Sequence, residues 1–232
     1  MRQLLSCALL SVCICLPAET ALSAKSIGAV TKPDLSGVWQ VGSMAGMLNA
    51  PYGPMTPYGK EMYEYNRDTR AGGEGRGKPD LDPLNKCWPA PLSFLLTYGD
   101  PFEIIQSDKR LLIIYEFDHI VRQIWLNEEH PANPDPTWMG NSVGHWEGDT
   151  LVVDTIAIHP RWLDNTGRVS SDQLHMVERY RRTADQLNLE ITYEDPKVFT
   201  ATWKRSVSYK LHPEIRLMEK VFCDDHYVES VY

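Results

Sequence analysis

Apolar and polar residues alternate along most of the chain after residue 102, as expected of β-strands with one buried face. The alternating runs are short, and turn residues separate them. The pattern predicts about nine strands, over residues 102–106, 111–117, 120–126, 143–146, 150–158, 175–182, 187–194, 200–211 and 215–223. Because short turns join most of them in chain order, the pattern favours a mainly β protein, with an antiparallel up-and-down barrel or a strongly curved sheet. A two-sheet sandwich is the main alternative.

The N-terminal part of the chain has a different pattern. Residues 35–41 read as a further strand that joins the sheet, whereas residues 49–100 are rich in proline, glycine and charge. Apart from a short helix near residues 59–68, we expect this segment to be irregular and to cover one end of the barrel. The sequence shows no internal repeat, so residues 25–232 are expected to form a single domain.

Two hairpins can be aligned from their turns. The pair Gly148-Asp149 lies between two alternating runs and predicts a tight turn. A turn at Ala184-Asp185 sets three cross-strand pairs on one mostly apolar face, which we expect to point inward. These pairs are Met176–Tyr193, Glu178–Ile191 and Tyr180–Leu189. The alignment therefore places the carboxylate of Glu178 inside the barrel, beside two tyrosines.

Other charged residues are also expected inside. Alternation groups Glu116 and Arg122 with aliphatic residues on their own strands, and a loop at residues 118–120 would set the two side chains opposite each other. An interior charge is costly unless it is paired and hydrogen-bonded. The sequence therefore predicts a buried Glu116–Arg122 ion pair close to Glu178. The alternative is that these charges lie at strand ends and reach solvent, or lock the barrel without any ligand.

These interior groups suggest the polar floor of a ligand cavity. Glu116 or Glu178 would act as general acid or base, and Arg122 would stabilise developing negative charge. The side chains expected to contact the ligand are Met176, Tyr180, Tyr193 and Trp203. Seven tryptophans and eleven tyrosines suit an apolar or aromatic molecule. The leading hypothesis is a barrel that binds a small molecule and that could act as a cofactor-independent lyase, isomerase or hydrolase. The alternatives are a non-catalytic carrier and a structural envelope protein with a filled barrel.

Several other function classes find no support in the sequence. No spacing of histidine, cysteine and carboxylate residues matches a metal site, and neither a nucleotide-binding glycine motif nor a nucleophile elbow occurs. The net charge of −8 argues against nucleic acid and anionic membrane surfaces as partners. We therefore expect no metal, no cofactor and no nucleic-acid partner.

Residues 1–24 have the pattern of a cleaved signal peptide. They combine Arg2, an apolar run over residues 4–16 that is too short to span a bilayer, and small residues before position 25. The mature chain is therefore expected to be periplasmic or secreted, with no membrane span. It would keep only Cys87 and Cys223, and in an oxidising compartment we expect these to form a disulfide. Two separate buried thiols are the alternative.

Several motifs occur together: DLSGVW at residues 34–39, DPLNKC at 82–87, GHWEGDTLVVDT at 144–155 and EDP at 194–196. This set resembles a family of secreted, largely uncharacterised bacterial proteins, and the opening LSGVW is similar to lipocalin-like (calycin) barrels. The family usually has a glycine and an arginine soon after its first mature cysteine, whereas residues 88–93 here read WPAPLS, and His159 stands where the family often has asparagine. We expect these departures to mark an altered pocket mouth. The resemblance implies the compartment and the single domain, and it implies no reaction.

Overall fold

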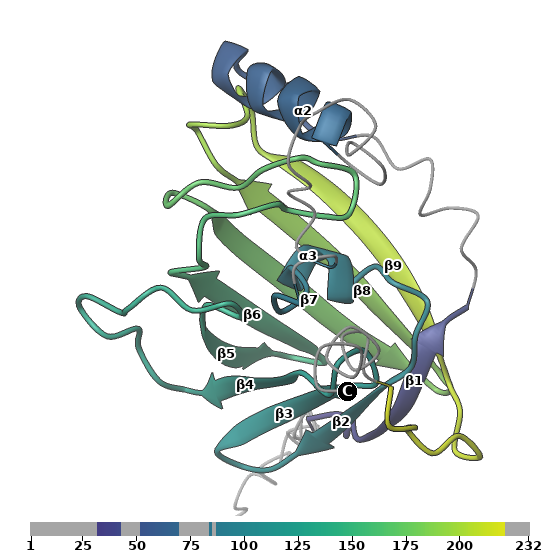
Figure 1. Cartoon of the computed structure of the whole chain (residues 1–232). Coiled ribbons are helices and arrows are strands. Elements are labelled where there is room, and N and C mark those ends of the chain that lie inside the picture. The colour runs from purple at the N-terminus through teal and green to yellow at the C-terminus, as the bar shows by residue number, and fades with distance from the viewer. Residues whose placement is uncertain (1–31, 43–51, 70–83, 85–86, 221–232) are drawn as a thin grey trace, which may run out of the picture.

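Nine strands form one closed barrel in chain order in this computed structural model, which describes residues 32–42, 52–69, 84 and 87–220 (Figure 1). The predicted mainly β barrel is confirmed. The strands are β1 (Gly37–Val41), β2 (Phe102–Gln106), β3 (Arg110–Tyr115), β4 (Val121–Leu126), β5 (Asn141–Glu147), β6 (Thr150–Ile156), β7 (His175–Thr183), β8 (Gln186–Glu194) and β9 (Trp203–Leu211). The described residues also form the helices α2 (Pro57–Thr69) and α3 (Leu92–Leu95).

Neighbouring strands are antiparallel with one exception, which the sequence pattern did not predict. β4 and β5 run parallel and share two pairs, Trp125–Val143 and Leu126–Gly144. Parallel neighbours need a connection that returns the chain to the starting end, and residues 127–140 provide it. β4, β5 and β7 therefore begin at the same end of the barrel, where β6 and β8 end. We call this end the pocket end.

Both predicted hairpins are confirmed. Glu147 pairs with Thr150 around Gly148, whose φ of +64° is readily available to glycine. In the second hairpin the register of β7 and β8 contains all three predicted pairs. The predicted inward residues of β7 are buried while their neighbours are more exposed, so alternation identified the inner face correctly.

The predicted last strand is wrong over the part that can be described. Residues 215–220 contain only an isolated parallel bridge, between Lys220 and Phe117. The edge of β9 is instead occupied by β1, with Trp39 opposite Leu211, so the barrel is already closed. Because a closed barrel has no free edge, no further strand can be added there. Residues 221–223 lie outside the described residues.

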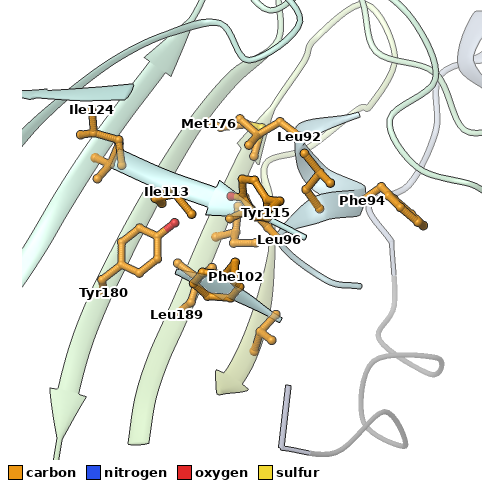
Figure 2. Close-up of a cluster of buried hydrophobic side chains, with 14 of the residues drawn as sticks. Leu92, Phe94, Leu96, Phe102, Ile113, Tyr115, Ile124, Met176, Tyr180 and Leu189 are labelled. Atoms are coloured by element: carbon orange, nitrogen blue, oxygen red, sulfur yellow. The ribbon is translucent and has the colours of Figure 1, made fainter. Parts of the chain in front are cut away.

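Helix α3 packs inside the barrel rather than merely covering it. The Ser93 hydroxyl bonds to the Tyr193 hydroxyl at 2.8 Å, and the Tyr209 hydroxyl donates to the Leu96 carbonyl. Tyr193 and Tyr209 lie near opposite ends of the paired strands β8 and β9. Figure 2 shows side chains from this region gathered with barrel residues in one apolar cluster. Helix α3 thus interrupts the segment that was expected to be irregular, and it contacts residues inside the barrel.

Helix α2 lies beyond the strand ends at the pocket end of the barrel, as Figure 1 shows. The Thr56 hydroxyl accepts the Gly59 N–H at 3.0 Å and caps the helix, and Pro57 suits its first turn because proline has no N–H to leave unpaired. Near its other end, the Asn66 amide donates to the Gly167 carbonyl at 2.9 Å. Neither helix of the described residues is long and apolar enough to cross a membrane.

Candidate functional site

A fully buried ion pair lies inside the barrel wall. Arg122 on β4 donates from Nη1 to Oε2 of Glu178 at 2.8 Å and from Nη2 to Oε1 at 2.7 Å. Both side chains are 0% exposed. This bidentate geometry matches the fork of the guanidinium to the two carboxylate oxygens. The predicted interior position of Glu178 is confirmed, and its charge is neutralised by Arg122.

Polar neighbours use much of the remaining hydrogen-bonding capacity of the pair. The Ser142 hydroxyl and the Thr155 hydroxyl accept from Arg122 at 3.0 and 2.9 Å, and the Tyr180 hydroxyl donates to Glu178 at 2.6 Å. Burial alone would lower the pKa of Arg122, but the charge and hydrogen bonds of Glu178 outweigh burial and raise the pKa. Burial, followed by the Glu178 charge, raises the pKa of Tyr180 well above its usual value. Arg122 therefore stays charged and Tyr180 stays a donor.

The predicted Glu116–Arg122 pair is wrong. Arg122 lies opposite Ile113, because the β3–β4 connection is longer than expected. The Tyr115 N–H bonds to the Ile120 carbonyl across a loop in which Asp118 and His119 have positive φ. The register is therefore displaced by an odd number of residues, which moves the side chains of one strand to the opposite face.

Glu116 has a different environment from the other two predicted charged residues. It follows the end of β3, is 5% exposed, and its Oε2 accepts the Met218 N–H at 2.9 Å. The neighbouring bridge from Phe117 to Lys220 adds to the same contact. Glu116 thus fixes the segment that follows β9 against the β3–β4 loop, and it does not belong to the interior cluster.

The hydroxyl of Tyr115 is a further polar group beside this cluster. Tyr115 is 3% exposed, and its hydroxyl has no hydrogen-bond partner among the described residues. Burial raises the pKa of Tyr115, the Arg122 charge lowers it, the Glu178 charge raises it, and a hydrogen-bonding interaction with Arg122 lowers it slightly. The net pKa is raised, so this hydroxyl is protonated. Arg122 lies close enough to act on its oxygen, whereas its own O–H has no acceptor among the described residues.

A small cavity lies at the pocket end, between α3 and the loop that joins β6 to β7. Its volume is about 20 Å³. Apolar side chains supply most of the wall, and the polar side chains that line it are Ser93, His159, Arg161 and Ser170. The apolar wall consists of Pro89, Pro91, Leu92, Trp138, Ile158, Trp162, Leu163, Leu174 and Met176. An apolar hollow with a few polar groups is typical of small-molecule sites.

Aromatic rings and one cation line the mouth of this cavity. The Arg161 guanidinium lies 4.0 Å from the ring centroid of Trp88 and 5.1 Å from that of Trp138. The His159 ring stacks on the indole of Trp138, with the two ring centroids 5.3 Å apart and an interplanar angle of 19°. Residues 88–93 and His159 were the positions expected to alter a pocket mouth, and several of them do line the cavity.

The residues predicted to bind ligand lie at different depths. Met176 lines the cavity directly. Tyr193 lies behind Ser93, and Trp203 stacks on Tyr193 with centroids 4.1 Å apart and an interplanar angle of 8°. Glu178 is the next inward-facing residue after Met176 on β7, and the Tyr180 hydroxyl is hydrogen-bonded to it. The cavity, Met176 and the ion pair therefore follow one another from the barrel end inward.

Sequence reasoning missed the part of the cavity wall that comes from other loop positions. Trp138, Trp162 and Arg161 lie in loops, where no alternation reveals which side chains meet. A usable signal was present in composition, since residues 158–162 concentrate histidine, arginine and tryptophan between two strands. Loops carry binding residues more often than their share of the chain suggests.

Buried polar atoms without partners concentrate near this end. In the described residues they include Nε of Arg161, Oδ2 of Asp164 and Nε of Arg168, all from the loop between β6 and β7, together with Nε1 of Trp203. Buried polar groups are normally hydrogen-bonded, so unpaired ones call for an explanation such as a bound water or ligand. The β6–β7 loop is thus organised differently from the interior cluster, where most groups are paired.

Two histidines share one carboxylate on the outer face near the same end. His130 lies 2.9 Å from Oδ1 of Asp154, and His175 lies 2.8 Å from Oδ2. These hydrogen bonds hold the pKa of Asp154 below its usual value, and the bond to Asp154 raises the pKa of His175. Within the described parts of the chain, no three His, Cys, Asp or Glu residues are arranged to hold a metal ion.

The cysteine prediction stays a prediction. Cys87 is exposed and forms no disulfide with another described residue, while Cys223 lies outside the described residues, as does the expected signal segment at residues 1–24.

No protein-family model matches the chain, and no curated protein matches it. Among solved structures the chain is similar to a variant of the fluorescent protein UnaG, with 15% sequence identity and a TM-score of 0.33. The match covers 78% of this chain and 97% of that chain. At this TM-score the likeness carries no argument about the site, so the site must be judged from its own geometry.

Proposed function

We propose that this protein binds a small apolar or aromatic molecule at the pocket end of its barrel. The observation that carries the proposal is the cavity beside α3, whose wall combines Trp138, Trp162, Met176 and aliphatic side chains with a few polar groups. Such a lining provides apolar burial for most of a ligand and polar contacts to orient it. The proposed compartment remains periplasmic or secreted, on the strength of the sequence of residues 1–24.

The ligand would have to displace side chains. A hollow of about 20 Å³ has room for roughly one water molecule. Met176 forms part of its wall, and a methionine side chain is unbranched and adapts readily to a new shape. Movement of Met176 would extend the cavity inward toward Glu178, which is the next residue on the same face of β7. We therefore propose that Met176 separates the cavity from the ion pair in the empty protein.

Catalysis by the interior groups is the second candidate. The observation that favours it is the unpaired Tyr115 hydroxyl beside Arg122 and Glu178, which leaves a donor available to a ligand that reaches past Met176. Glu178 would act as the base and Arg122 would stabilise negative charge, as proposed from the sequence. This candidate would be supported if the protein converts a bound ligand and if Tyr115→Phe abolishes that turnover but retains binding. Binding without turnover would favour a carrier.

A thermal-shift screen tests the binding proposal. A panel of apolar and aromatic compounds should include molecules that raise the melting temperature saturably, because a ligand of the folded state stabilises it by mass action. Met176→Phe fills the wall with a larger, stiffer side chain and should weaken binding by about tenfold or more. Ile105→Phe is the matched control, since Ile105 is 44% exposed on the outer face of β2.

The two variants distinguish the outcomes. Loss of the shift in Met176→Phe, with the shift retained in Ile105→Phe and both proteins folded by circular dichroism, supports the pocket-end site. A shift that Met176→Phe retains unchanged would place the ligand elsewhere. A panel that gives no shift with the unmodified protein would instead favour the third hypothesis, a structural protein with a filled barrel.

A further inference from the structure

Arg161 is a cation in an apolar wall without a counter-ion among the described residues. Its guanidinium contacts the rings of Trp88 and Trp138, and its Nε is buried with no hydrogen-bond partner. The hydrogen bonds that the residue does make in the described structure are through its main chain, to Ser170. The cavity lining in which it takes part contains no aspartate or glutamate.

This arrangement is costly in the empty protein. A buried donor left unpaired loses its interaction with water and gains nothing in return. The contacts with two indole faces compensate the charge only in part, because a cation over an aromatic ring is attracted less strongly than one beside a carboxylate. The contrast with Arg122 is direct, since Arg122 forms a bidentate pair with Glu178.

The guanidinium carbon of Arg161 lies over two indole rings, which limits how its N–H groups can meet a ligand. A guanidinium that stacks on aromatic rings uses its faces for that contact and keeps its N–H groups in its own plane. In-plane N–H groups bind a carboxylate in a bidentate manner. The indole rings of Trp138 and Trp162 and the apolar rings of Pro89 and Pro91 line the same cavity as Arg161. The wall thus offers flat apolar surfaces next to an anion-binding edge.

We infer that the ligand is a planar aromatic carboxylate, with its ring against the apolar wall and its carboxylate on the N–H groups of Arg161. This inference rests on the proposed binding function and narrows it to one chemical class. The ligand would supply the acceptor that Nε of Arg161 lacks, and it would leave the two indole contacts in place. Arg161 would then be the residue that decides specificity between charged and neutral aromatic molecules.

Benzoate and benzamide provide the test. They are nearly the same size and shape, and benzoate is a small member of the proposed class, so it requires little displacement of side chains compared with larger members. Calorimetric titration of the unmodified protein at neutral pH should show benzoate binding about tenfold more tightly than benzamide, the difference expected for one charge-assisted contact. Arg161→Met keeps the apolar stem and should bind both compounds equally. Arg161→Lys keeps the charge but not the fork, and should retain part of the preference.

Controls separate this inference from the proposed function. Arg179→Met removes an arginine that pairs with Glu147 on the outer face, and it should leave the preference for benzoate unchanged. Equal binding of both compounds by the unmodified protein would overturn the inference and leave the binding function standing. If neither compound binds, the inference fails, and the broader screen alone decides the binding function. If Arg161→Met does not fold, the benzoate preference of the unmodified protein and its reduction in Arg161→Lys still decide the inference.

Discussion

Arg122 and Arg161 both place a guanidinium against the interior of the protein, but only Arg122 has a counter-ion among the described residues. Arg122 projects from a strand, is fully buried, and bonds to Glu178 and two hydroxyl groups. Arg161 lies in the β6–β7 loop, and aromatic rings supply its side-chain contacts among the described residues. The strand-borne charge is satisfied within the protein, as a stable interior requires. The loop-borne charge is left for another molecule, and that difference separates a structural cluster from a recognition site.

The largest expected effect comes from breaking the interior pair. Arg122→Met leaves Glu178 charged, buried and unpaired, and should lower the free energy of unfolding by about 3–5 kcal/mol. Replacing both residues, in Arg122→Met with Glu178→Met, should cost much less because no charge remains in the interior. Urea unfolding of the two single variants and the double variant measures this coupling. Additive single effects would show that the pair contributes nothing as a pair.

Two tyrosines beside that pair offer a smaller and sharper comparison. Tyr180→Phe removes the hydroxyl that donates to Glu178 at 2.6 Å, and should cost about 1–3 kcal/mol because a charged acceptor loses a donor. Tyr115→Phe removes a buried hydroxyl that has no partner among the described residues, so it should be neutral or slightly stabilising. Thermal unfolding of both variants checks the difference. A larger loss for Tyr115→Phe would mean that its hydroxyl is satisfied after all.

The same two regions show what the sequence could and could not predict. Period-two alternation and turn chemistry located most strands and the full register of β7 and β8, and with them the interior position of Glu178. These signals are local, since a turn fixes the register of the strands on both sides of it. The β3–β4 loop gave no such signal. Its positive φ values at Asp118 and His119 belong to a longer connection than expected, and the partner of Arg122 was therefore misassigned.

The pocket end was harder to predict because it is built from distant segments. Trp88, Trp138 and Arg161 meet there although long stretches of chain separate them. The parallel pairing of β4 and β5 and the packing of α3 inside the barrel bring those segments together. Neither feature produces a periodic pattern in the sequence. Only the residue types at positions 88–93 and at His159 therefore indicated a pocket mouth.

Removal of the Arg161 guanidinium should have little effect on the stability of the fold. Arg161→Met should change the free energy of unfolding by less than about 1 kcal/mol, because the lost cation–π contacts are partly offset by removal of an unpaired buried donor. This is far less than the effect expected for Arg122→Met, although both changes remove one guanidinium. Urea unfolding under the same conditions compares them. Equal losses would indicate that Arg161 has a structural partner and would remove the contrast between the two arginines.

The smallest effect should appear as a pH dependence of the His130–Asp154–His175 cluster. The pKa of His175 is raised above 6.5, chiefly by its hydrogen bond to Asp154. A raised pKa in the folded state means that protonated His175 stabilises the fold below its unfolded-state pKa and that this contribution is lost as the pH rises through the folded-state value. The side chain is 36% exposed, so solvent screening should keep the contribution below about 1 kcal/mol.

The difference in unfolding free energy between the unmodified protein and His175→Gln should therefore be largest in mildly acidic buffer and should shrink toward alkaline pH. At lower pH it should also shrink, as Asp154, whose pKa is depressed, becomes protonated. A difference that grows from mildly acidic to alkaline pH would contradict the assigned role of the Asp154 contact.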